Sequence, residues 1–318
     1  MAGGTTKVVI AALIGNAAIA VTKFAAAAFT GSSAMFAEAV HSVVDTGNQL
    51  LLLYGIRRAG RPADAVHPFG YGKEIYFWAF VVAILLFALG SGISIYEGLH
   101  KIADPQPLSD AYVNYIVLGL AMVFEAAAWT VAYRAFERER GNTPILRAVR
   151  QSKDPALFTV LFEDSAAMLG LLAALTGVFL SDRFGIYRAD GAASLVIGGI
   201  LAVAALLLAI ETKGLLIGEA ASDDLLQSVI GLAGQAPFVE AVNEVRTMHF
   251  GPADVLVNIS VDARNTLMAR EIEAEVSRLE ARIKAEHPEV SRVFIEIQAA
   301  SDSADQMAPG DEGSAEPA

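Results

Sequence analysis

Six long apolar stretches occupy the first two thirds of the chain. A helix needs about 20 mostly apolar residues to cross the hydrocarbon core of a bilayer, and each stretch is of that order. They are Val8–Phe29, Met35–Gly55, Ile75–Ile95, Tyr112–Ala132, Ala156–Leu180 and Ala192–Ile217. The sequence therefore predicts an α-helical membrane protein, with a domain of six transmembrane helices over residues 1–218.

Composition agrees with this prediction and excludes several classes of protein. Hydrophobic residues make up 54% of the 318 and charged residues only 18%, whereas soluble domains contain about 25% charged residues. The net charge of −12 argues against nucleic acid as a partner. The absence of cysteine excludes disulfides, thiolate metal sites and a cysteine nucleophile.

The distribution of Lys and Arg predicts the orientation in the membrane, because cytoplasmic loops carry the excess of positive charge. Ten basic residues follow the second and fourth stretches: Arg57, Arg58, Arg61, Lys73, Arg134, Arg138, Arg140, Arg147, Arg150 and Lys153. The opposite loops hold three: Lys101, Arg183 and Arg188. We therefore expect a multi-pass protein of the cell membrane with both termini in the cytoplasm.

The pattern changes after residue 218. Residues 219–300 are predicted to form a small α+β domain, with a sheet that carries helices on one face. The expected elements, in order, are a helix over 222–235, strands over 244–250 and 254–261, a helix over 267–286 and a strand over 291–298. Residues 301–318 are rich in acids, Gly, Ser and Pro and contain no basic residue. They are predicted to form a disordered acidic tail.

Polar residues inside the second stretch point to a function, because ionisable groups are costly within a membrane. Glu38, His41, Asp45 and Asn48 fall within one stripe about 80° wide at helical periodicity. His41 and Asp45 are four residues apart and lie one helical turn from each other. An imidazole and a carboxylate placed in this way can supply two ligands to a divalent metal ion.

The fifth stretch supplies further carboxylates. Glu163 and Asp164 are adjacent and point about 100° apart. We expect Asp164 to be the metal ligand, and Glu163 either to support it or to face a water-filled cavity. A single polar residue between membrane helices often serves only as a hydrogen-bonding contact. Several ionisable residues on two stretches are better explained by a metal site.

An ordered set of motifs resembles the cation diffusion facilitator family of divalent-metal/proton antiporters. The motifs are GSSAMFAEAVHSVVDTGNQ, HPFGYGKE, FEDSAAMLG, DGAASLVIG, LLIGEAAS and EVRTMHFGP. The resemblance as a whole covers about residues 7–298. The resemblance implies six spans per subunit, a homodimer and a cytoplasmic ferredoxin-like domain. It also implies a tetrahedral metal site between the second and fifth helices, with two ligands from each.

Three of those four ligands are present in this sequence. The first pair corresponds to His41 and Asp45, and the second to Val160 and Asp164. Val160 cannot coordinate a metal, so water, Asn48 or Glu163 is expected to complete the site. Glu38 is expected either to add a ligand or to support the others. Zinc suits three such ligands with an open position, and iron, manganese and cobalt are alternatives.

A second metal site of the family lies in the loop after the second helix. Its three positions correspond to Asp64, His67 and Tyr71, of which two can bind metal. The sequence predicts either a weak metal site or a structured loop without metal.

The cytoplasmic binuclear site of the family is expected to be absent. Its positions correspond to Asn243, Asn258 and Ile297, which are poor ligands or none. His249 and His287 are interpreted as ordinary sheet or surface residues. The C-terminal domain is therefore expected to act as a dimerisation module.

These features favour a transporter over an enzyme. Metal binding needs neutral His41 and ionised Asp45 and Asp164, so it releases protons and couples metal efflux to proton influx. Expected partners are divalent metal ions, protons, the bilayer and a second copy of the chain. The alternative is a sensor or scaffold of the same family that binds metal without transport. An intramembrane metalloprotease is disfavoured, because no HExxH pair is present.

Overall fold

The structure consists of long helices followed by a small sheet. The computed structural model describes residues 2–30, 33–105, 111–141, 143–144, 148 and 152–299. The side chains of residues 2–4, 26–27, 29–30, 33–38, 40–41 and 139 are outside that description, as are residues 301–318, where the acidic tail is predicted. The chain divides into two compact units, Met1–Ile217 and Gly218–Ala318.

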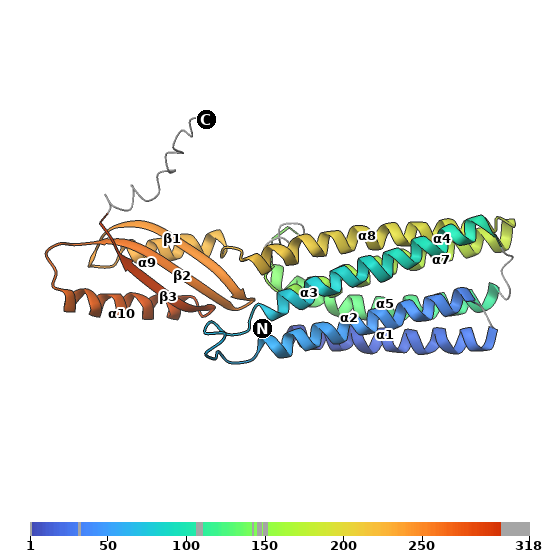
Figure 1. Cartoon of the computed structure of the whole chain (residues 1–318), viewed down its shortest axis with the longest axis horizontal. Coiled ribbons are helices and arrows are strands. Elements are labelled where there is room, and N and C mark those ends of the chain that lie inside the picture. Colours follow the sequence, from blue (N-terminus) through green and yellow to red (C-terminus); the bar gives the residue numbers. More distant parts are fainter. Residues whose placement is uncertain are drawn as a thin grey trace, which may run out of the picture. The chain divides into compact units, whose positions relative to one another are not determined.

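The first unit is a bundle of long helices. Its elements are α1 (Ala2–Thr30), α2 (Ser33–Ala59), α3 (Glu74–Leu85), the π-helical turn η1 (Leu86–Ser91), α4 (Gly92–Ala103), α5 (Ala111–Arg140), α7 (Pro155–Phe184) and α8 (Arg188–Ile217) (Figure 1). α1 packs against α2 and α5, α7 against α5 and α8, and α8 against α3 and α4. A helix satisfies its own backbone hydrogen bonds, and a lipid environment requires this.

Five segments of the described chain are long and apolar enough to cross a membrane. They are Thr5–Ala25, Glu74–Ala103, Ala111–Arg138, Pro155–Phe184 and Arg188–Ile217. The remaining predicted stretch forms the 27-residue helix α2. Part of this helix, residues 33–38 and 40–41, lies outside the described side chains, and its described part contains Asp45, Arg57 and Arg58.

The third predicted stretch extends further than expected. It continues from Ile95 to Ala103, and the π turn η1 lies within it. At this point the helix contacts α8 closely: Ser91 Oγ donates a 2.8 Å hydrogen bond to the carbonyl of Gly198. A Cβ on Gly198 would lie 2.5 Å from Ile95 Cγ1, so only glycine fits this crossing.

Residues at both ends of α7 define where this helix starts and stops. The Asp154 side chain accepts a hydrogen bond from the Leu157 N–H and caps the N-terminus, with Pro155 in the first turn. Thr5 Oγ1 also donates to the Asp154 carboxylate, which ties the start of α7 to α1. Gly185 ends the helix with a left-handed φ of 68°, a conformation that glycine adopts without strain.

The second unit contains the expected order of elements. These are α9 (Asp223–Gly234), β1 (Val239–Gly251), β2 (Asp254–Ala263), α10 (Ala269–Glu286) and β3 (Val290–Ile297). The sheet order is β1-β2-β3, with β1 antiparallel and β3 parallel to β2. The alternate residues Val255, Val257, Ile259 and Val261 are fully buried, and α9 and α10 contribute to the same core. The predicted face of this strand is confirmed.

β1 begins five residues before the predicted start at 244. Between Val239 and Glu244 its pairing with β2 shifts register twice, as in β-bulges. A bulge breaks the two-residue alternation from which a strand is recognised in a sequence, so this part of β1 has no clear pattern.

Candidate functional site

The polar stripe of α2 faces the interior of the bundle over its described part. Asp45, Asn48 and Gln49 are all buried. Glu38 and His41 belong to the same helix, but their side chains lie outside the described residues. The structure therefore describes one of the two predicted metal ligands on α2, Asp45.

Glu163 links α7 to α2. Asn48 Nδ2 donates to Glu163 Oε1 at 2.8 Å, and Gln49 Nε2 donates to Glu163 Oε2 at 2.7 Å. Both carboxylate oxygens are thus engaged by amides of α2. This geometry suits a supporting position next to a metal site better than direct coordination.

Asp164 is as deeply buried as Glu163 but has different surroundings. Its side chain is only 1% exposed, and among the described residues no donor reaches its Oδ2 atom. A buried carboxylate oxygen without a donor is costly unless a cation or proton binds it. Asp164 therefore has the free coordination capacity that a metal ligand requires.

Among the described residues of the first unit, two further ionisable side chains lie in the interior, and neither belongs to the predicted site. Glu125 of α5 is 6% exposed and Lys23 of α1 is 5% exposed. Lys23 Nζ donates a 3.0 Å hydrogen bond to Ser42 Oγ of α2. The sequence does contain a feature that could identify both residues, because each places an ionisable group within an apolar stretch.

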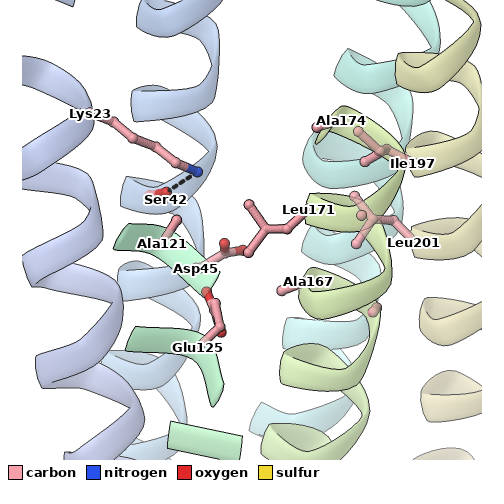
Figure 2. Close-up of a pocket in the computed structure, with 12 residues that line it drawn as sticks. Lys23, Ser42, Asp45, Ala121, Glu125, Ala167, Leu171, Ala174, Ile197 and Leu201 are labelled. Atoms are coloured by element: carbon pink, nitrogen blue, oxygen red, sulfur yellow. Dashed lines mark hydrogen bonds between the residues drawn. The ribbon is translucent and has the colours of Figure 1, made fainter. Parts of the chain in front are cut away.

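A cavity of about 40 Å³ lies among these residues. Its polar lining comes from Lys23, Ser42, Asp45 and Glu125, and small and aliphatic residues of α7 and α8 form the opposite wall. Figure 2 shows Asp45 and Glu125 facing that wall, with Lys23 and Ser42 on the same side as the two carboxylates. Because a water molecule needs about 10–15 Å³ of such volume, the cavity has room for small ligands.

The charges in this region do not balance. Asp45, Glu125, Glu163 and Asp164 interact electrostatically across three helices, and Lys23 supplies positive charge to the cavity. An excess of carboxylates in a low-dielectric interior requires protons or a cation to neutralise it. The buried carboxylates can therefore hold either protons or a cation.

No complete metal site is visible among the described side chains. Within them, no three His, Asp or Glu residues lie close enough together to hold one metal ion. His41 is outside this set. Val160, at the family position four residues before Asp164, is fully buried in the apolar core of the bundle and offers no ligand.

The loop after α2 is organised around Asp64. Its Oδ1 atom accepts hydrogen bonds from the Val66 and His67 N–H groups, and Tyr71 Oη donates to Oδ2 at 2.6 Å. His67 Nδ1 lies 3.7 Å from Asp64 Oδ1. Tyr71 thus takes up a carboxylate oxygen at the place where the family pattern has a third ligand.

The two histidines of the second unit have partners within the protein. His249 is buried with its Nδ1 atom 3.1 Å from the carbonyl oxygen of Gly251. His287 Nε2 lies 2.7 Å from Ser228 Oγ. These contacts are those of structural residues.

Comparison with known proteins adds a separate line of evidence. Residues 9–217 match the family described as the cation efflux transmembrane domain. The chain is 32% identical to the proton-coupled zinc antiporter SLC30A9, mitochondrial, of Xenopus laevis, over 92% of this chain and 60% of that protein. It is 29% identical to metal tolerance protein C4 of Arabidopsis thaliana, over 76% of this chain and 53% of the relative.

A bacterial relative covers a smaller part of this chain. The cation-efflux pump FieF of Shigella flexneri serotype 5b is 28% identical over 76% of this chain and 78% of that pump. The chain spans about 60% of the length of the zinc antiporters that it matches.

Proposed function

We infer a transport function from one premise: the chain belongs to the cation efflux family. We propose that it exchanges a divalent metal cation, zinc first of all, for protons across a membrane. The names of its relatives, a proton-coupled zinc antiporter and a cation-efflux pump, support this proposal. The family and the five apolar helices make the chain a multi-pass membrane protein, and we propose α2 as a sixth span.

One observation carries the proposal: buried carboxylates of α2, α5 and α7 interact electrostatically, and two of them, Asp45 and Glu125, line a small cavity. We propose His41, Asp45 and Asp164 as metal ligands, with Asn48 and Glu163 holding α2 and α7 in register. A metal ion that binds these residues displaces their protons. Alternate opening of the cavity to the two sides of the membrane would then couple the two fluxes.

The proposal extends to the environment of the chain. Its excess of Lys and Arg on one set of loops favours a cell-membrane protein with both termini in the cytoplasm. The Xenopus relative is named as mitochondrial, so a mitochondrial membrane is the alternative compartment. We propose that residues 219–300 form a ferredoxin-like domain through which two copies pair.

The test is zinc flux into vesicles that contain the purified full chain and a zinc-sensitive dye. We expect flux that depends on a proton gradient and apparent zinc affinity that rises between about pH 5.5 and 7.5, around the ordinary pKa of histidine. Asp164→Asn should reduce flux to background. Asp182→Asn is the matched control, because Asp182 lies on the same helix but is exposed.

The outcomes separate the hypotheses. Normal flux in Asp164→Asn would remove this residue from the site. Zinc binding by the unaltered chain without flux under any gradient would favour the sensor or scaffold alternative.

A further inference from the structure

Lys23 places a positive charge inside the bundle. It belongs to the apolar segment Thr5–Ala25 of α1, and its side chain is only 5% exposed. An ammonium group is costly in such a segment unless negative charge and hydrogen-bond acceptors surround it. Neither the polar stripe of α2 nor the ligand set proposed above gives this residue a role.

A hydrogen bond holds the ammonium group of Lys23 at the cavity. Its Nζ atom donates to Ser42 Oγ of α2 at 3.0 Å, and both side chains line the cavity (Figure 2). Ser42 is buried and lies three residues before Asp45 on α2, and residues at this spacing share one face of a helix. The lysine side chain therefore extends from α1 to the face of α2 that carries Asp45.

The other polar side chains that line this cavity are acidic. Asp45 of α2 and Glu125 of α5 both contribute a carboxylate. The Glu125 carboxylate is attracted by the Lys23 ammonium and repelled by the Asp45 carboxylate. Two carboxylates in a low-dielectric interior require positive charge to balance them, and Lys23 supplies part of it from within the protein.

Asp45 connects this cavity to the proposed metal site. The cavity lining contains two possible metal ligands, Asp45 and Glu125, which is fewer than a metal site needs. A metal ion therefore binds Asp45 together with residues outside the cavity, and the lysine remains on the cavity side. A metal ion and an ammonium group near the same carboxylate repel each other, and a low dielectric strengthens that repulsion.

We propose that Lys23 is a built-in cation that competes with the transported metal for the negative charge of Asp45 and Glu125, and that it thereby lowers the metal affinity of the site. This inference rests on the proposed function. A transporter has to release its cargo as well as bind it, and a fixed positive charge beside the site favours release. Lys23 thus sets the affinity of the site without touching the metal.

The test is zinc binding by the full chain in detergent, measured by isothermal titration. Lys23→Gln removes the charge and keeps a donor for Ser42, so it should bind zinc more tightly. Coupling between two binding sites typically changes affinity by about 5–150-fold, and we expect an increase of at least about fivefold. Lys23→Arg keeps the charge and should not tighten binding. Lys7→Gln is the matched control, because Lys7 lies on the same helix but is exposed, and it should bind zinc like the unaltered chain.

The direction of the change separates competition from a structural role. Loss of a residue that only holds α1 against α2 would weaken zinc binding or unfold the protein, and it would not tighten binding. Size-exclusion chromatography shows whether each variant is folded. If Lys23→Gln does not fold, Glu125→Gln is added to remove the carboxylate that has lost its counter-ion. This double variant should bind zinc more tightly than Glu125→Gln alone.

The outcomes also distinguish this inference from the proposed function. Zinc affinity in Lys23→Gln that is equal to or below that of the unaltered chain would overturn the inference, and transport by the unaltered chain would still stand. An equal gain in affinity in Lys7→Gln would also overturn it, because the cause would then be net charge and not the cavity. If the unaltered chain neither binds nor moves zinc, the proposed function itself fails.

Discussion

A single carboxylate organises the loop between α2 and α3. Asp64 accepts three hydrogen bonds, from Tyr71 Oη and from the N–H groups of Val66 and His67. The pKa of Asp64 lies below its ordinary value. The hydrogen bond from the Tyr71 hydroxyl is the main cause, and the one from the His67 N–H is the next. Arg61 lies over the ring of Tyr71, 4.6 Å from its centre, so the tyrosine ring has a contact that does not depend on its hydroxyl.

Tyr71→Phe keeps that ring and removes one hydrogen bond from the carboxylate. We expect the pKa of Asp64 to rise toward the ordinary aspartate value of about 3.9. Because the folded-state pKa is lowered, Asp64 stabilises the loop at neutral pH, and this contribution is lost as pH falls through that pKa. The measurement is a ¹³C NMR titration of labelled aspartate carboxyls, with Asp64→Asn for assignment. Tyr187→Phe, in another loop, should leave the titration unchanged, and an unshifted Asp64 in Tyr71→Phe would contradict the prediction.

At the scale of elements, the start of α7 depends on a half-buried cap. Asp154 accepts the N–H of Leu157 and the hydroxyl of Thr5. Asp154→Ala should lower the free energy of unfolding by about 1 kcal/mol, the usual cost of losing such a cap. Thermal unfolding in detergent measures this change. Asp154→Asn keeps a capping oxygen and should retain most of the stability, so an equal loss in both variants would argue against capping as the cause.

The same residue makes stability depend on pH. Burial raises the pKa of the Asp154 carboxyl, although hydrogen bonds from Thr5 and Leu157 act in the opposite direction. A raised pKa in the folded state means that this group favours folding at acid pH and does so less as pH rises through that value. Asparagine does not titrate, so the free energy of unfolding of Asp154→Asn should change less with pH around the folded-state pKa of Asp154. Thermal unfolding of both proteins at several pH values measures this difference.

Two neighbouring glycines on α8 offer a test of helix packing. A Cβ at Gly198 would lie 2.5 Å from Ile95 Cγ1, whereas one at Gly199 would meet nothing within 4 Å. Gly198→Ala should therefore destabilise the crossing of α8 with α4 by about 1–3 kcal/mol, the usual cost of overpacking. Gly199→Ala should leave the stability of this crossing unchanged, because its new methyl group meets no neighbour. The free energies of unfolding of the two variants are compared in the same detergent. Equal values would contradict the prediction, because they would mean that α4 and α8 move apart without loss of stability.

At the scale of the whole molecule, the charges on the loops predict the orientation of the chain. The segment Glu74–Ala103 is a candidate span, so its two ends should lie on opposite sides of the membrane. The loop before it carries Arg57, Arg58, Arg61 and Lys73, which favours the cytoplasm.

The absence of cysteine allows a direct test of that orientation. Ala63 and Ala103 are both exposed, and each can be replaced by a single cysteine. In intact cells, a membrane-impermeant maleimide should label Ala103→Cys, whereas Ala63→Cys should react only after permeabilisation. The reverse pattern would place the basic loops outside and refute the proposed orientation.

The features that depend on local pattern could be predicted from the sequence. Apolar stretches of sufficient length indicated the helices, and the alternation of Val255, Val257, Ile259 and Val261 indicated a buried strand face. The stripe containing Asp45 and Asn48 correctly indicated the buried side of α2. In each case a helix or strand repeats with a known period, so a residue's neighbours along the chain reveal the face on which it lies.

The pairing of charged groups across helices followed no such rule. Glu163 accepts hydrogen bonds from the side-chain amides of Asn48 and Gln49, and Glu125 faces the cavity with Asp45 and Lys23. These contacts depend on how each helix is rotated and on which helix lies beside it. These residues come from α1, α2, α5 and α7, which are far apart in sequence. Packing of whole helices sets those contacts, so only the three-dimensional arrangement reveals which carboxylates have partners and which have an oxygen left to bind a cation.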